Sequence, residues 1–78
     1  MPDIDKLMTI FARTFPDAQM PENFIDLELG DFKEWDSLGN FNLLLAIEES
    51  YGIRLDMEDM ATLKSVKDFL QKLNREGV

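Results

Sequence analysis

The sequence predicts an all-α fold: a small four-helix bundle of three main helices and a short third helix, with a long loop between helices one and two. Apolar residues recur at helical spacing in three separate segments, and capping residues, prolines or glycines stand at the segment ends. No run of alternating apolar and polar residues indicates a strand. With 78 residues, the chain is expected to form one domain, 1–78, held by packing because it has no cysteine.

The first helix is expected between Asp3 and Phe15, with Asp3 as its N-cap and Pro16 as its stop. Its apolar positions follow helical spacing: Ile4, Leu7, Met8, Phe11 and Phe15. The next segment, 16–35, contains prolines and a glycine and shows no period, so it is predicted to be a long ordered loop. The apolar residues expected to pin this loop are Phe24, Ile25, Leu27, Leu29, Phe32 and Trp35. A loop this long is unusual in a small domain, and we expect it to present the residues around position 37.

The second helix is expected from Leu38 to Tyr51, with Gly52 ending it. On a helical wheel, four apolar residues fall in one arc of about 100° that suits a core: Leu43, Leu44, Ile47 and Tyr51. A second apolar group lies on the opposite side, next to Asn42 and two glutamates: Leu38, Phe41 and Leu45. The helix is therefore either buried on two sides, or exposes an apolar strip rimmed by acids on which a partner docks.

Two capping patterns predict the remaining helices. Asp56 is a candidate cap for a short helix of one or two turns through Met60. Ser65 begins a capping-box pattern ahead of an apolar stripe formed by Val66, Phe69, Leu70 and Leu73. The last residues, 74–78, are expected to fray.

The charge of the chain excludes some classes of partner. Sixteen acidic and eight basic residues give a formal net charge of −8, which repels nucleic acid and anionic membranes and attracts proteins with basic patches. No cysteine or histidine is present for a zinc, copper or haem site. A calcium loop starting at Asp56 would place Ala61 and Lys67 where glycine and a bidentate glutamate belong, so no metal site is expected. No signal peptide or membrane-spanning segment is recognised, and a cytoplasmic monomer is expected.

Ser37 is the residue whose chemistry needs explaining. It could cap the second helix by accepting from the Asn40 backbone N–H. A nucleophilic role would need a base, but the chain has no histidine, no lysine three residues on and no G-x-S-x-G elbow, so a hydrolase is not expected. In a third interpretation, Ser37 is an acceptor that another enzyme modifies, and a phosphate ester there would suit the positive end of the helix.

The triplet Asp36-Ser37-Leu38, followed by the LLLAIEESYGI and TLKSVKDFL segments, resembles the acyl carrier proteins over about residues 25–73. The resemblance implies that a phosphopantetheinyl transferase esterifies Ser37 with 4′-phosphopantetheine from coenzyme A. The thiol of this arm then holds acyl or aminoacyl cargo as a thioester, and the chain itself is not an enzyme. The resemblance also implies that Asp36 and Leu38 flank the modified serine. The implied partner-docking residues are Leu38, Phe41, Leu45, Glu48, Glu49, Met57 and Met60. Leu43, Leu44 and Ile47 would line aliphatic cargo.

Three positions differ from the usual fatty-acid carriers. Gly39 and Asn42 stand where acidic residues are usual, and Trp35 stands where a small residue is usual. The run from Gly39 to Glu48 is similar to carriers of D-alanine. We therefore expect a specialised carrier, loaded by its own acyl or aminoacyl ligase and serving downstream acyl-transferring enzymes with basic patches, in specialised lipid or polyketide synthesis rather than main fatty-acid synthesis. The alternative of another class is an unmodified acidic helical interaction module.

Overall fold

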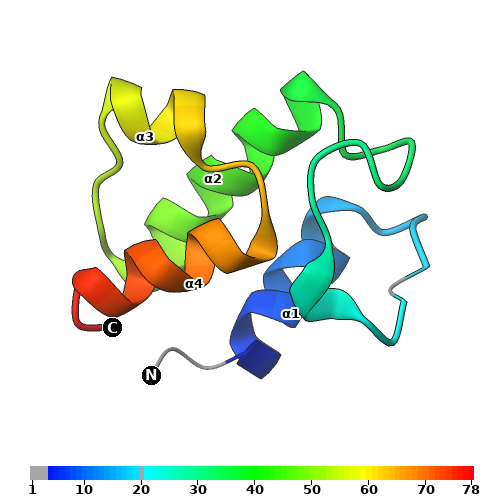
Figure 1. Cartoon of the computed structure of the whole chain (residues 1–78), viewed down its shortest axis with the longest axis horizontal. Helices are drawn as coiled ribbons and strands as arrows, with labels where there is room; N and C mark the ends of the chain where they lie inside the picture. The colour runs from blue at the N-terminus through cyan, green and yellow to red at the C-terminus, as the bar shows by residue number, and fades with distance from the viewer. Residues whose placement is uncertain (1–3, 20) are drawn as a thin grey trace.

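The computed structural model describes residues 4–19 and 21–78. Within these residues, the chain forms four α-helices and one 3-10 turn (Figure 1): α1 (Ile4–Thr14), η1 (Phe24–Asp26), α2 (Ser37–Tyr51), α3 (Met57–Thr62) and α4 (Val66–Arg75). The described part of the chain contains no strand, although Glu28 and Ser65 form one isolated antiparallel bridge. The predicted all-α class is confirmed.

The helix ends differ slightly from the predicted ones. The N-cap predicted at Asp3 lies outside the described residues, and α1 ends one residue before Phe15, whose backbone N–H still donates to Phe11 at 2.8 Å. Helix α3 continues to Thr62, beyond the predicted Met60, and α4 continues to Arg75. Gly52 adopts the left-handed conformation (φ 66°) and ends α2, as predicted.

One aromatic cluster forms the centre of the core. The Phe11 ring on α1 lies 4.9 Å from Phe24, 5.1 Å from Trp35 and 6.0 Å from Phe69, measured between ring centroids. Around this cluster, α2 contributes its predicted arc, of which Leu43, Leu44 and Ile47 are buried and Tyr51 is half-buried. Because each of α1, α2 and α4 places an apolar stripe on this centre, they pack together through it.

The loop between α1 and α2 is ordered, as predicted. In Figure 1 it lies at the right of the view. Two backbone hydrogen bonds join it to the segment between α3 and α4 and to the first residue of α4. Leu29 N–H donates to Lys64 at 2.8 Å, and Val66 N–H donates to Leu27 at 3.0 Å. Of its predicted anchors, Phe24, Leu27 and Trp35 are buried and Leu29 and Phe32 are half-buried. Ile25 is 42% exposed, so its predicted anchoring role is wrong: the 3-10 turn directs Phe24 inward and Ile25 outward.

A buried chain of hydrogen bonds connects this loop to α2 and to the α3–α4 segment. The Trp35 indole Nε1–H donates to Asn40 Oδ1 at 2.9 Å, and Asn40 Nδ2 donates to the Leu63 carbonyl at 3.0 Å. Trp35 is fully buried and Asn40 is 4% exposed. Because a buried polar group without a partner is costly, each of these three groups depends on the other two.

Asn40→Ala should lower the free energy of unfolding by about 1–3 kcal/mol, because it leaves the Trp35 N–H and the Leu63 carbonyl buried without partners. Urea denaturation measures this loss. Asn42→Ala is the matched control, because Asn42 is exposed on the same helix, and we expect it to change stability by less than about 0.5 kcal/mol. Equal stability of the two variants would contradict the importance of the buried chain.

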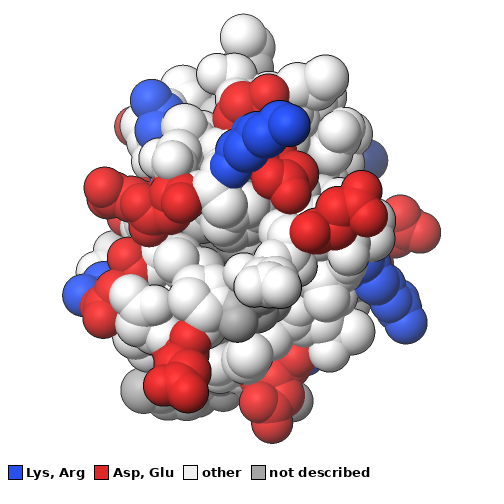
Figure 2. Space-filling view, turned by 90° about the vertical axis from the view of Figure 1, so that its right-hand side faces the viewer, with Lys and Arg blue, Asp and Glu red and all other residues white. Residues whose placement is uncertain are grey.

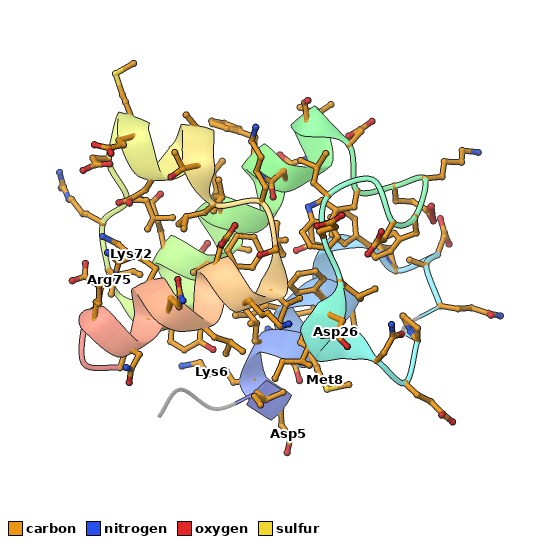
Figure 3. The ribbon with its side chains drawn as sticks, viewed as in Figure 1. Asp5, Lys6, Met8, Asp26, Lys72 and Arg75 are labelled. Carbon is orange, nitrogen blue, oxygen red and sulfur yellow. The ribbon has the colours of Figure 1, made fainter. Side chains whose placement is uncertain are left out.

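Helix α3 has no fully buried residue, although Met60 packs half-buried against the core, so polar contacts contribute much of its attachment. Asp56 and Asp59 form a reciprocal capping box at its start. The Asp59 carboxylate also lies 3.1 Å from the ammonium of Lys72 on α4. Figure 3 labels Lys72. Although desolvation opposes ionisation of Asp59, the hydrogen bond from Lys72 and those from Asp56 outweigh it and hold the pKa of Asp59 below its ordinary value of 3.8. The same hydrogen bond raises the pKa of Lys72.

This ion pair predicts a pH dependence of stability. A carboxylate whose pKa is lowered by folding stabilises the folded state above its ordinary pKa and loses that effect as the pH falls through its folded value. Wild type should therefore be more stable than Asp59→Asn at neutral pH, and the difference should shrink below about pH 4 as Asp59 protonates. Thermal unfolding of both proteins from pH 7 to pH 2 measures this. A difference that stays constant over that range would contradict the assignment.

Candidate functional site

Ser37 is the first residue of α2, and the helix does not use its hydroxyl as a cap. The N-cap is Asp36, whose extended backbone (φ −100°, ψ −168°) precedes the helix. Asp36 Oδ1 accepts a hydrogen bond from the Gly39 N–H at 2.8 Å, and the Asp36 carbonyl accepts from the Asn40 N–H at 2.8 Å. The interpretation of Ser37 as a cap for Asn40 is therefore wrong, because Ser37 is already helical. Ser37 is exposed, and it lies at the positive end of the helix.

Close contact with the loop explains the glycine two residues after Ser37. A Cβ atom built on Gly39 would lie 2.3 Å from the Glu34 carbonyl oxygen and 2.9 Å from Cε1 of Phe15. No side chain fits there unless the loop moves, so only glycine allows the loop to pass this close to α2. Gly39 therefore has a structural cause in this chain: the space that an acidic side chain would need is filled by the loop.

The second apolar group of α2 is exposed. Leu38 is 70% exposed, Phe41 47% and Leu45 44%. The interpretation that α2 is buried on two sides is wrong, because no other element of the described chain covers these residues. We call Leu38, Phe41 and Leu45 the apolar strip; it begins beside Ser37 and follows the helix away from it.

The other residues expected to dock partners have different environments. Met57, the first residue of α3, is 89% exposed, whereas Met60 is half-buried and packs against the core. Glu49 is exposed. Glu48 is only partly exposed, and its Oε2 accepts a hydrogen bond of 2.7 Å from the backbone N–H of Leu55. This carboxylate joins the end of α2 to the segment that leads into α3, a role that its place in the sequence did not indicate.

A depression of about 360 Å³ lies between the end of α1 and the start of α2, and Leu38 is part of its lining. Its lining combines the Phe15 ring with loop and helix residues: Thr14, Pro16, Asp17, Glu34, Asp36, Leu38, Gly39 and Asn42. The depression therefore includes three acidic residues: Asp17, Glu34 and Asp36. Figure 2, which looks onto the loop side of the molecule, shows acidic side chains scattered around a largely uncharged centre.

The residues that the carrier resemblance implies as cargo lining are fully packed. Leu43, Leu44 and Ile47 are each at most 2% exposed and belong to the main core. Aliphatic cargo would contact them only after α2 separates from a neighbouring helix. The described residues bring together no group of three or more acidic side chains suited to hold a metal ion.

Comparison of the chain with protein-family models, with curated proteins and with solved structures gives no match. The geometry of Ser37 and its surroundings is therefore the basis for assigning a function. In the described part of the chain, no helix has the length and apolar character needed to cross a membrane.

The two neighbouring glutamates of α2 should respond differently to substitution. Glu48→Ala removes the acceptor for the Leu55 N–H and should lower the free energy of unfolding by about 1–3 kcal/mol. Glu49→Ala is the matched control and should change it by less than about 0.5 kcal/mol. Denaturation in urea compares the two variants, and a larger loss for Glu49→Ala would refute the structural role of Glu48.

Proposed function

We propose that this chain is a carrier protein, a four-helix bundle whose Ser37 bears a 4′-phosphopantetheine arm. The observation that carries this proposal is the exposed serine at the first position of α2, which is freed from capping by Asp36. A serine in this position is accessible to a visiting enzyme, and it needs no base in its own chain. The resemblance of residues 36–38 and of the helices that follow to the acyl carrier proteins supports the same function.

The attachment reaction needs only the hydroxyl from this chain. The Ser37 oxygen attacks the phosphorus that carries the pantetheine group in coenzyme A, and the phosphoanhydride bond breaks. Adenosine 3′,5′-bisphosphate leaves, and a base of the transferase takes the serine proton. The resulting phosphodiester fits the start of α2, where the helix dipole favours negative charge. When bound, the arm supplies a thiol, a group that this cysteine-free chain does not have. The thiol holds acyl or aminoacyl cargo as a thioester.

The residues around Ser37 position it for such an enzyme. Asp36 fixes the first turn of α2, and the Trp35–Asn40 hydrogen bond attaches that turn to the core. The serine is therefore presented from a rigid element rather than from a flexible loop. Pre-organisation of this kind lowers the cost of bringing the hydroxyl into a partner's active site.

We infer further that the carrier is a cytoplasmic monomer dedicated to a specialised pathway, with its own ligase for acyl or aminoacyl cargo. Two features support the specialised pathway: Gly39 cannot be replaced by an acidic residue without a clash, and Asn42 is an uncharged residue where fatty-acid carriers usually have an acid. The start of α2 therefore lacks the negative charge that enzymes of main fatty-acid synthesis would meet on their usual carrier.

Intact mass spectrometry tests the carrier function. Wild type incubated with coenzyme A and a broad-specificity phosphopantetheinyl transferase should gain the mass of one phosphopantetheine. Ser37→Ala should gain nothing, while Ser50→Ala, which removes an exposed serine at the other end of α2, should gain the full mass. No gain by wild type would overturn the proposal and favour an unmodified acidic interaction module.

A further inference from the structure

Helix α3 is hydrogen-bonded to α2 at both of its ends. Just before α3, the Leu55 backbone N–H donates to Glu48 Oε2 at 2.7 Å. Just after α3, the Leu63 carbonyl accepts from Asn40 Nδ2 at 3.0 Å. Because Asn40 and Glu48 are two helical turns apart, these bonds lie about 12 Å from each other along the axis of α2. We call the two bonds the ties, and the contact region between them the α2–α3 seam.

The seam is packed as well as tied. Leu55 and Leu63, which flank α3, are 8% and 6% exposed and belong to the main core. Between the two ties, α2 contributes three core residues that are each at most 2% exposed: Leu43, Leu44 and Ile47. Close-packed side chains do not make room for extra methylene groups without moving. A chain that entered the seam would therefore push α3 away from α2 and break the ties.

The tie through Asn40 is the nearer one to Ser37, and it is the more costly to break. Asn40 lies three residues after Ser37, one turn along the helix on its inner side. It is 4% exposed and bonded to the fully buried Trp35 as well as to Leu63. Separation of Leu63 from Asn40 would leave an amide and a carbonyl without partners among apolar side chains, which strongly opposes opening.

The opposite flank of the first turn of α2 is closed by the loop. The Glu34 carbonyl lies so near Gly39 that a Cβ atom there would be 2.3 Å from its oxygen, and the Phe15 ring lies beside it. The depression outside this contact includes Asp17 and Asp36 in its lining. An aliphatic chain placed there would displace water from carboxylates and offer them no hydrogen bond, so this flank does not favour such a chain either.

We propose, on the basis of the proposed carrier function, that cargo on the Ser37 arm stays outside the bundle, and that the ties make this a carrier of short or polar acyl groups, aminoacyl groups included. A long aliphatic group held outside leaves its methylene groups in water, whereas a short or polar group loses little there. Leu43, Leu44 and Ile47 then belong to the core alone and do not line cargo, contrary to what the resemblance to acyl carrier proteins implies.

The rate of thioester cleavage by hydroxylamine, followed by intact mass spectrometry, tests this. The broad-specificity transferase loads wild type with the acylated arm from octanoyl-coenzyme A or acetyl-coenzyme A. A group drawn into the bundle is shielded, so its cleavage slows relative to the same coenzyme A thioester. On wild type, both groups should be cleaved within about twofold of their coenzyme A thioesters. The two forms should also unfold at the same Tm, because buried cargo would stabilise only the folded state.

Variants that remove a tie should admit the longer chain. Asn40→Ala opens the seam at the end near Ser37 and should slow cleavage of the octanoyl group by about fivefold or more, with the acetyl group unchanged. Its octanoyl form should also have a higher Tm than its acetyl form. Asn42→Ala, which alters an exposed residue of the same helix, is the matched control and should behave as wild type. Glu48→Ala opens the other end and should act in the same direction as Asn40→Ala, which gives a second reading if circular dichroism shows that Asn40→Ala has lost structure.

The outcomes separate this inference from the function on which it rests. If wild type accepts no arm, from coenzyme A or from its thioesters, the carrier function itself fails. If wild type shields the octanoyl group but not the acetyl group, the chain enters with the ties in place, and the inference is overturned. It is overturned equally if the octanoyl group is exposed on wild type and on the folded variants alike, because the ties would then not determine where the cargo lies.

Discussion

The hydrogen bonds that run from the Trp35 indole through the Asn40 side chain to the Leu63 carbonyl join three segments that are distant in sequence. One end of the chain of bonds lies in the loop, its middle lies on α2, and its other end lies in the turn before α4. The surrounding aromatic rings exclude water, so these bonds have no solvent to compete with them. The start of α2 therefore has one favourable position, and the orientation of Ser37 follows from it.

The close passage of the loop over α2 depends on the same position. With Trp35 buried, the Glu34 carbonyl is brought against Gly39, and Asp36 is left in the extended conformation that a cap requires. Three consecutive residues thus have three different tasks: Trp35 anchors, Asp36 caps and Ser37 remains available. The exposed strip beyond them costs the fold some apolar burial, which is a cost that a surface used for binding commonly carries.

Much of this fold could be predicted from the sequence, because apolar spacing and capping residues are local signals. The periods of α1, α2 and α4 gave their positions, and the wheel of α2 separated Leu43 and Leu44 in the core from Phe41 outside it. The burial of Asn40 and its hydrogen bond to Trp35 could not be predicted, because the sequence pattern of a helix does not distinguish a polar residue in contact with water from one bonded to an indole. The roles of Gly39 and Glu48 depend on a loop and a turn that return to α2, and no local pattern encodes those returns. The exposure of Ser37 could be anticipated, because a serine that another enzyme modifies must be accessible. That Asp36, and not Ser37, caps the helix became clear only from the backbone conformation of Asp36.

Trp35 is the only tryptophan of the chain, it is fully buried, and its N–H is bonded to the first turns of the helix that carries Ser37. Its fluorescence is therefore a signal that comes from this one place. Displacement of α2 from the core would bring water to the indole and shift its emission to longer wavelength. Events at the serine that leave α2 seated would leave the emission unchanged. The protein thus contains an intrinsic optical reporter that distinguishes a partner that only grips the surface from one that opens the core.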